Sequence, residues 1–167
     1  MYANAGGTYS EQLRPYIGKI GVTPLVDDNQ FKQLLRDAGK NDPVMHRVQD
    51  EFFDKRYFEP AMTWADSNGF TLALSALVIY DSFIHSGSIL GFLRKRFPEA
   101  PPANDGDEKT WITQYVDARQ DWLANADNAA LHATVYRTEC FKREIVRDNW
   151  DLSQLPINAN GVDVSGV

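Results

Sequence analysis

Apolar residues recur along most of this chain at the spacing of an amphipathic helix. The longest such stretch begins at Pro43, with Asp42 before it as an N-cap, and runs to residue 68. Its apolar positions share one helical face: Val44, Val48, Phe52 and Phe53. Pro60 lacks a backbone N–H, so we expect it to interrupt this helix near residues 58–59.

A second stretch, residues 71–87, is apolar nearly all round and should therefore run through the centre of the fold. Shorter helices are predicted over residues 11–17 and from about residue 29 to residue 39, and two longer ones over 108–125 and 129–149. Alternation with a period of two, typical of strands, is nearly absent. The predicted fold class is all-α, with six to seven helices around a central buried helix.

Length and composition predict one globular domain over residues 10–155. A loose, glycine-rich segment (residues 1–9) should precede it, and an irregular tail (residues 156–167) should follow. The chain is 43% hydrophobic and 24% charged, which is typical of a globular protein. Residues 98–107 contain adjacent prolines and an Asn-Asp-Gly-Asp run, which predict a mobile surface loop.

Several functional classes are disfavoured. The net charge of −6 argues against a general nucleic-acid-binding protein. The most apolar run, residues 70–84, contains Asp81 and is short for a membrane span, and the first ten residues lack the regions of a signal peptide. Cys140 is the single cysteine and should be a buried structural thiol, while the three histidines lack metal-ligand spacing. We therefore expect no transmembrane segment, metal or cofactor in this chain.

Three charged residues fall where helical geometry predicts an apolar environment. Asp81 lies one turn from Leu77 and from Ile84, and Arg119 and Arg137 lie on the apolar faces of two later helices. Because unpaired buried charges are costly, we expect the aspartate to pair with both arginines. The network could fix the register of the helices, or it could also tune a catalytic carboxyl nearby. Helical spacing alone favours the purely structural interpretation.

His85 and the aromatic residues each allow two interpretations. His85 lies one turn after Asp81 and could bond to it or to backbone, or could line a ligand groove. The four tryptophans, among them Trp64, fall mostly at helical core spacing, which favours core packing over a sugar-stacking platform. The chain has no GxSxG or HExxH motif. Its clustered carboxylates, Asp50, Glu51, Asp54 and Glu59, form what should be a solvent-exposed helical face.

Several motifs in one order resemble the family-46 chitosanases, glycoside hydrolases of the lysozyme superfamily. They are QDE, YFEPA, YDSFIHSG, WITQYVDARQDWL, TVYRTECF and NWDL, which occur in this order between residues 49 and 152. The resemblance as a whole covers about residues 13–155. The resemblance implies the larger helical lobe of such an enzyme. It also implies that Asp81, Arg119 and Arg137 match a buried network that supports the catalytic acid. It places His85 at the edge of the substrate cleft, with Tyr80 and Ser86 beside it as candidate substrate-binding residues.

This sequence also departs from the pattern of the family that it resembles. The family's catalytic glutamate and aspartate lie in a smaller N-terminal lobe, and the F-E-T-G-like segment of similar cell-wall-associated relatives has no counterpart here. We therefore expect this chain to lack the catalytic acid and the N-terminal lobe to be a missing partner.

The expected function is that of the helical lobe of a hydrolase cleaving β-1,4-linked amino-sugar polymers. Peptidoglycan, as for a lysozyme, is slightly favoured over chitosan. A non-catalytic glycan-binding or scaffolding module derived from that fold is the alternative. Either would bind polysaccharide at the bacterial cell envelope or outside the producing cell.

Overall fold

A computed structural model describes residues 1–166 and divides the chain into two compact units, Met1–Arg56 and Tyr57–Val167. Each unit has a buried apolar cluster of its own. These units are defined by internal packing and do not test whether residues 10–155 act as one folding domain, which stays a prediction. The all-α fold class is confirmed, because helices make up most of both units.

The first unit consists of short helical turns packed on two longer helices. In order they are η1 (Tyr2–Asn4), α1 (Ser10–Leu13), η2 (Arg14–Lys19), α2 (Asn29–Asn41) and α3 (Pro43–Phe53). The predicted helix at residues 11–17 is thus α-helical only over its first turn and continues as a 3-10 helix. The segment expected to be loose contains two buried residues, Tyr2 and Ala3, which join the apolar cluster.

Asp42 fixes the N-terminal segment to the start of α3. Its Oδ1 accepts a hydrogen bond from the Val44 amide at 2.9 Å, which is the predicted N-cap. Its Oδ2 accepts from the Tyr2 hydroxyl at 2.6 Å and from the Thr8 amide at 2.7 Å. The Tyr2 hydrogen bond is the main reason why the pKa of Asp42 is lowered, and the backbone amides add to it.

The helix predicted from residue 43 to residue 68 is interrupted, as expected from Pro60. A π-helical turn, Asp54–Phe58, follows α3, and α4 (Glu59–Ser67) begins with Pro60 in its first turn. The proline ring cannot follow a regular helical turn without a clash, so the hydrogen-bonding pattern changes before it. Gly69 ends this region with a φ of 78°.

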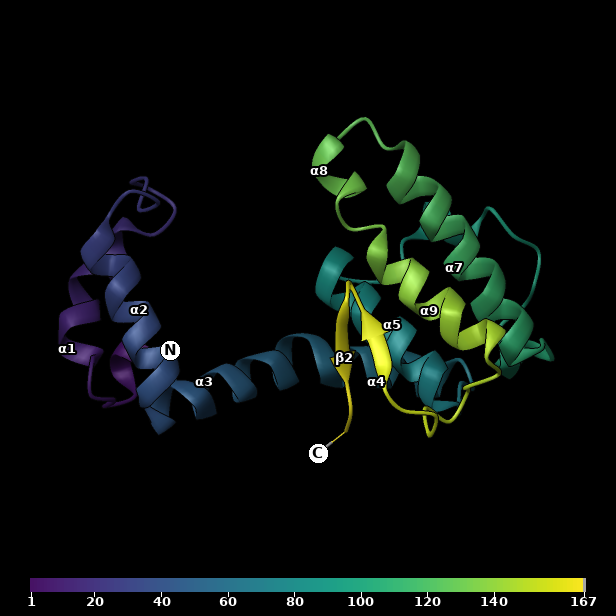
Figure 1. Cartoon of the computed structure of the whole chain (residues 1–167), viewed down its shortest axis with the longest axis horizontal. Coiled ribbons are helices and arrows are strands. Elements are labelled where there is room, and N and C mark those ends of the chain that lie inside the picture. Colours follow the sequence, from purple (N-terminus) through teal and green to yellow (C-terminus); the bar gives the residue numbers. More distant parts are fainter. Residues whose placement is uncertain (167) are drawn as a thin grey trace. The chain divides into compact units, whose positions relative to one another are not determined.

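The second unit is built around α5 (Ala73–Ser86), the predicted central helix (Figure 1). α5 contacts α4, α7 (Glu108–Asn125) and α9 (Tyr136–Val146). The short helices α6 (Gly91–Arg94) and α8 (Ala129–His132) contact α7. The buried side chains of α5 are Leu74, Ser75, Val78, Ile79, Ser82 and Phe83. Trp111 and Tyr115 of α7 stack on one another within the same core.

The prediction of one continuous helix over residues 129–149 is wrong, because a turn at residues 133–135 separates α8 from α9. Thr134 and Val135 are β-branched and favour the helix less than unbranched residues do. The Thr134 hydroxyl also donates to the Leu131 carbonyl at 2.6 Å, a local bond that competes with helical hydrogen bonding.

Two segments expected to be irregular are held by the rest of the second unit. Residues 98–107 form a loop that contains a 3-10 turn, η4 (Pro102–Asn104), and the Ala103 amide bonds to the Asn68 carbonyl at 2.9 Å. In place of the expected irregular tail, residues 157–164 form an antiparallel hairpin of β1 (Ile157–Ala159) and β2 (Val162–Val164). Residue 167 of that tail lies outside the described residues. Over residues 1–166, none of the helices combines the length and apolarity needed to cross a membrane.

Candidate functional site

Asp81, Arg119 and Arg137 come together from three helices of the second unit, α5, α7 and α9. Nη1 of Arg119 lies 2.7 Å from Oδ2 of Asp81, and Nη1 of Arg137 donates a hydrogen bond to Oδ1. The predicted ion pairs are therefore present. The Arg119 side chain is 1% exposed, that of Asp81 13% and that of Arg137 26%. The network thus has a buried end at Arg119 and an open end at Arg137.

The network carries a net charge of +1 and holds donors without acceptors. Nε and Nη2 of Arg119 and Nε of Arg137 are buried and lack a hydrogen-bond acceptor among residues 1–166. Buried donors in native proteins nearly always have an acceptor, so such groups call for an explanation. A water molecule or an anionic group could satisfy them.

His85 lies on α5 one turn beyond Asp81, as predicted. Its Nδ1 is 3.4 Å from the Ser86 hydroxyl, and within the described chain it makes no hydrogen bond to Asp81. Burial lowers the pKa of His85, and the positive charges of Arg119 and Arg137 lower it further, against a smaller opposing effect of Asp81. His85 should therefore be neutral at pH 7 and able to donate or accept a hydrogen bond.

Tyr80 and Ser86 are partly exposed on the same helix. The Tyr80 ring meets the Phe58 ring edge to face, with centroids 5.4 Å apart. Next to the network, the buried Tyr115 hydroxyl donates to the Ser82 hydroxyl at 2.9 Å, which in turn donates to the Val78 carbonyl. Burial is the main cause of a raised pKa at Tyr115. This pair was not predicted from the sequence, because it depends on how α7 crosses α5.

A cavity of about 290 Å³ lies beside the open end of the network. Asp81 and Arg137 form its charged side. Its other walls are mostly apolar and come from α5, α9 and the hairpin: Leu77, Cys140, Phe141, Ile157 and Val164. Cys140 is a free, buried thiol, as predicted, and burial raises its pKa. The sequence did not predict the cavity, because the hairpin that closes it was expected to be irregular.

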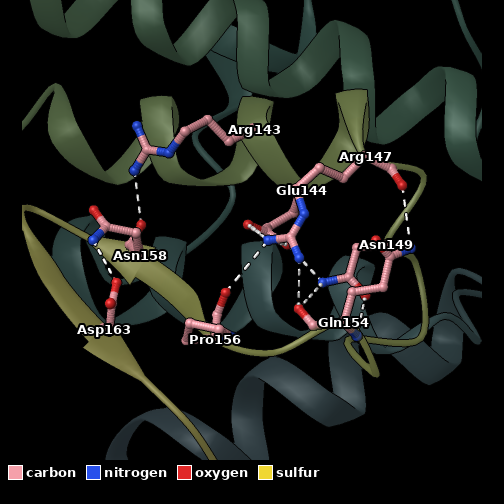
Figure 2. A network of polar contacts seen from close by, with 8 residues as sticks. All are labelled: Arg143, Glu144, Arg147, Asn149, Gln154, Pro156, Asn158 and Asp163. Atoms are coloured by element: carbon pink, nitrogen blue, oxygen red, sulfur yellow. Dashed lines mark hydrogen bonds and ion pairs between the residues drawn. The ribbon is translucent and has the colours of Figure 1, made fainter.

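A second polar network holds that hairpin on α9 (Figure 2). Glu144 is 2% exposed and accepts hydrogen bonds from Arg147 at 3.1 Å and from Asn149 at 2.6 Å. Arg147 and Arg143 also donate to backbone carbonyls of the C-terminal segment, those of Gln154 and Asn158. The apolar wall of the cavity is therefore fixed by charge-assisted hydrogen bonds made outside it.

The clustered carboxylates are exposed, as predicted. Glu51 lies 3.8 Å from Arg47, one turn earlier on α3. Asp50, Glu51 and Asp54 belong to the first unit, and Glu59 begins α4 in the second. In the second unit, Asp81 is committed to two arginines. Among residues 1–166, no group of three or more histidine, cysteine, aspartate or glutamate side chains is arranged to hold a metal ion.

Comparison with known proteins gives related sequences and folds. The chitosanase of Bacillus subtilis strain 168 is 32% identical over 96 residues, which is 53% of this chain and 35% of that protein. The chitosanase of Streptomyces sp. strain N174 is 31% identical over 120 residues, 67% of this chain and 42% of that protein. The chain thus matches about a third to two fifths of the length of these curated relatives.

Solved structures show the same fold. The complex of the Gynuella sunshinyii GH46 chitosanase with chitotetraose gives a TM-score of 0.76 at 23% identity, covering 91% of this chain and 70% of that one. A mutant chitosanase from Bacillus subtilis MY002, complexed with 6 GlcN, gives 0.75 at 22% identity, covering 94% and 71%. In addition, the model of Glycosyl hydrolase family 46 matches residues 8–157. Because this match covers most of the chain, including the helices that carry Asp81, Arg119 and Arg137, the chain belongs to glycosyl hydrolase family 46.

Proposed function

We propose that this chain forms the helical part of a glycoside hydrolase that cleaves chitosan, a polymer of β-1,4-linked glucosamine. One observation carries the proposal: the family match covers the three helices that bring Asp81, Arg119 and Arg137 into one buried network. Both curated relatives are chitosanases. The net charge of −6 also suits a polymer that carries ammonium groups.

Glycoside hydrolysis requires two carboxyl groups across the scissile bond. One protonates the leaving oxygen, and the other either activates water or attacks the sugar. Asp81 cannot take either part while it neutralises two guanidinium groups. We assign it a positioning role: it holds Arg137 at the open end of the network, where the remaining donors of that guanidinium can orient a carboxyl group.

We further propose that this carboxyl group comes from an N-terminal lobe outside the chain. The unsatisfied Nε donor of Arg137, at the open end, supports this, because a carboxylate is the acceptor that a guanidinium binds best. A neutral His85, with Tyr80 and Ser86, would then line the part of the cleft that this chain supplies.

The test is hydrolysis of two polymers, measured as the release of reducing ends. The 167-residue chain alone should release few or none from chitosan or from peptidoglycan. The same chain preceded by the N-terminal lobe of a family-46 chitosanase should hydrolyse chitosan. In that fusion, Asp81→Asn should lower kcat more than it changes KM, because a positioning role acts in the transition state.

Three outcomes would contradict these proposals. A well-folded fusion that is inactive on chitosan would refute the chitosanase assignment and favour a glycan-binding module. Hydrolysis of peptidoglycan alone would assign a lysozyme-like specificity. Robust hydrolysis by the unfused chain would place the acid within it, most directly at Glu51 or Glu59.

A further inference from the structure

A shallow surface groove of about 550 Å³ lies along α4 and shares no lining residue with the cavity beside the Asp81 network. One face of α4 forms most of it, with Phe83 of α5 at its side. The α4 residues that line it are Glu59, Pro60, Thr63, Trp64 and Ser67. Its volume falls within the range of about 300–1,000 Å³ that is usual for small-molecule sites.

Trp64 gives the groove a rigid aromatic wall. Its ring stacks on Phe70, with centroids 5.7 Å apart and planes 23° apart. It also lies against the fully buried Trp111, at 5.9 Å. The indole is therefore anchored on its core side, while part of it remains exposed in the groove. A fixed aromatic surface loses little conformational entropy when a flat ligand stacks on it.

Polar groups line the groove next to this wall. Glu59 is exposed, and within residues 1–166 its carboxylate makes neither a hydrogen bond nor an ion pair. The Ser67 hydroxyl donates to the Thr63 carbonyl at 2.7 Å, so its oxygen can still accept a hydrogen bond. The groove thus combines an apolar aromatic surface, an available carboxylate and two hydroxyl groups.

We propose that this groove is an accessory binding site for β-1,4-linked glucosamine. A pyranose ring in this linkage presents an apolar face of C–H groups, which suits the exposed part of Trp64, and an ammonium group at its edge, which suits Glu59. N-acetylation removes that positive charge, so the site should prefer free glucosamine units over acetylated ones. The choice of glucosamine rests on the proposed function, whereas the site itself rests on Trp64 and Glu59.

The experiment is a titration of the isotope-labelled 167-residue chain with the glucosamine hexamer, followed by nuclear magnetic resonance at low salt. The indole N–H signal of Trp64, identified by its absence in Trp64→Leu, should shift on titration. Glu59→Gln should weaken this binding about two- to fivefold, as expected for one exposed charge pair. Asp127→Asn is the matched control, because Asp127 is an exposed carboxylate outside the groove and should leave the affinity unchanged. The N-acetylglucosamine hexamer should bind more weakly than the glucosamine hexamer.

Two results would overturn the site: a Trp64 signal that does not move at saturating hexamer, or a Glu59→Gln variant that binds as the parent does. Glu59→Gln keeps the test valid if Trp64→Leu unfolds the core. The same spectra separate this inference from the proposed function, which concerns the signals of α5 around His85. Shifts at His85 without shifts at Trp64 would refute only the accessory site, and the reverse pattern would count against only the proposed cleft.

Discussion

Replacing Asp81 with alanine tests the buried network most directly. The change leaves the guanidinium of Arg119, 1% exposed, without its counter-ion. Removing one partner of a buried ion pair costs about 3–5 kcal/mol. Arg137 is 26% exposed and can turn toward water, so it should add little. We therefore expect the lower end of that range, a loss of about 3 kcal/mol in the free energy of unfolding.

The assay is urea unfolding followed by tryptophan fluorescence, which reports on the second unit because all four tryptophans lie there. A loss of this size should also lower the Tm by roughly 6–12 °C. Asp117→Ala is the matched control, because Asp117 pairs with Lys142 at 2.6 Å but both side chains are about half exposed. That change should cost at most about 1 kcal/mol.

A double variant separates loss of charge pairing from loss of packing. Asp81→Leu combined with Arg119→Met removes both buried charges, so it should be more stable than Asp81→Leu alone. If Asp81→Ala lowers the free energy of unfolding by less than about 1 kcal/mol, the network is hydrated and contributes little to stability. That result would refute a buried, stabilising ion pair between Asp81 and Arg119.

Two further predictions concern other parts of the chain. Because the pKa of Asp42 is lower in the folded than in the unfolded chain, its stabilising effect is present above the unfolded pKa and is lost as the pH falls through the folded one. The hydrogen-exchange protection factor of the Thr8 amide should therefore fall under acidic conditions, and Asp42→Asn should remove this pH dependence; a pH-independent parent would contradict it. Gly69→Ala should destabilise the second unit by at least about 1–2 kcal/mol, because φ is 78° and a Cβ would lie 2.8 Å from the Ala103 nitrogen. Gly91→Ala, with open space at its Cβ, is the control in urea unfolding, and equal losses would contradict the strain at Gly69.

Local sequence determined the helical elements and most of their ends. The Asp42 cap and the interruption before Pro60 were predicted, because each depends on one side chain and its nearest backbone. The separation of α8 from α9 and the hairpin at residues 157–164 were not predicted. The hairpin strands are only three residues long, so periodicity gave almost no signal.

For the candidate site, the sequence by itself determined that Asp81, Arg119 and Arg137 lie on apolar helical faces, and the cost of an unpaired buried charge then predicted that they pair. Only the tertiary structure decided which end of that network is open, because exposure at Arg137 depends on how α9 and the hairpin lie against α5. It also decided the surroundings of Trp64 and Glu59. Helical spacing assigns a residue to a face, but the packing of neighbouring helices determines whether that face is covered or lines a groove.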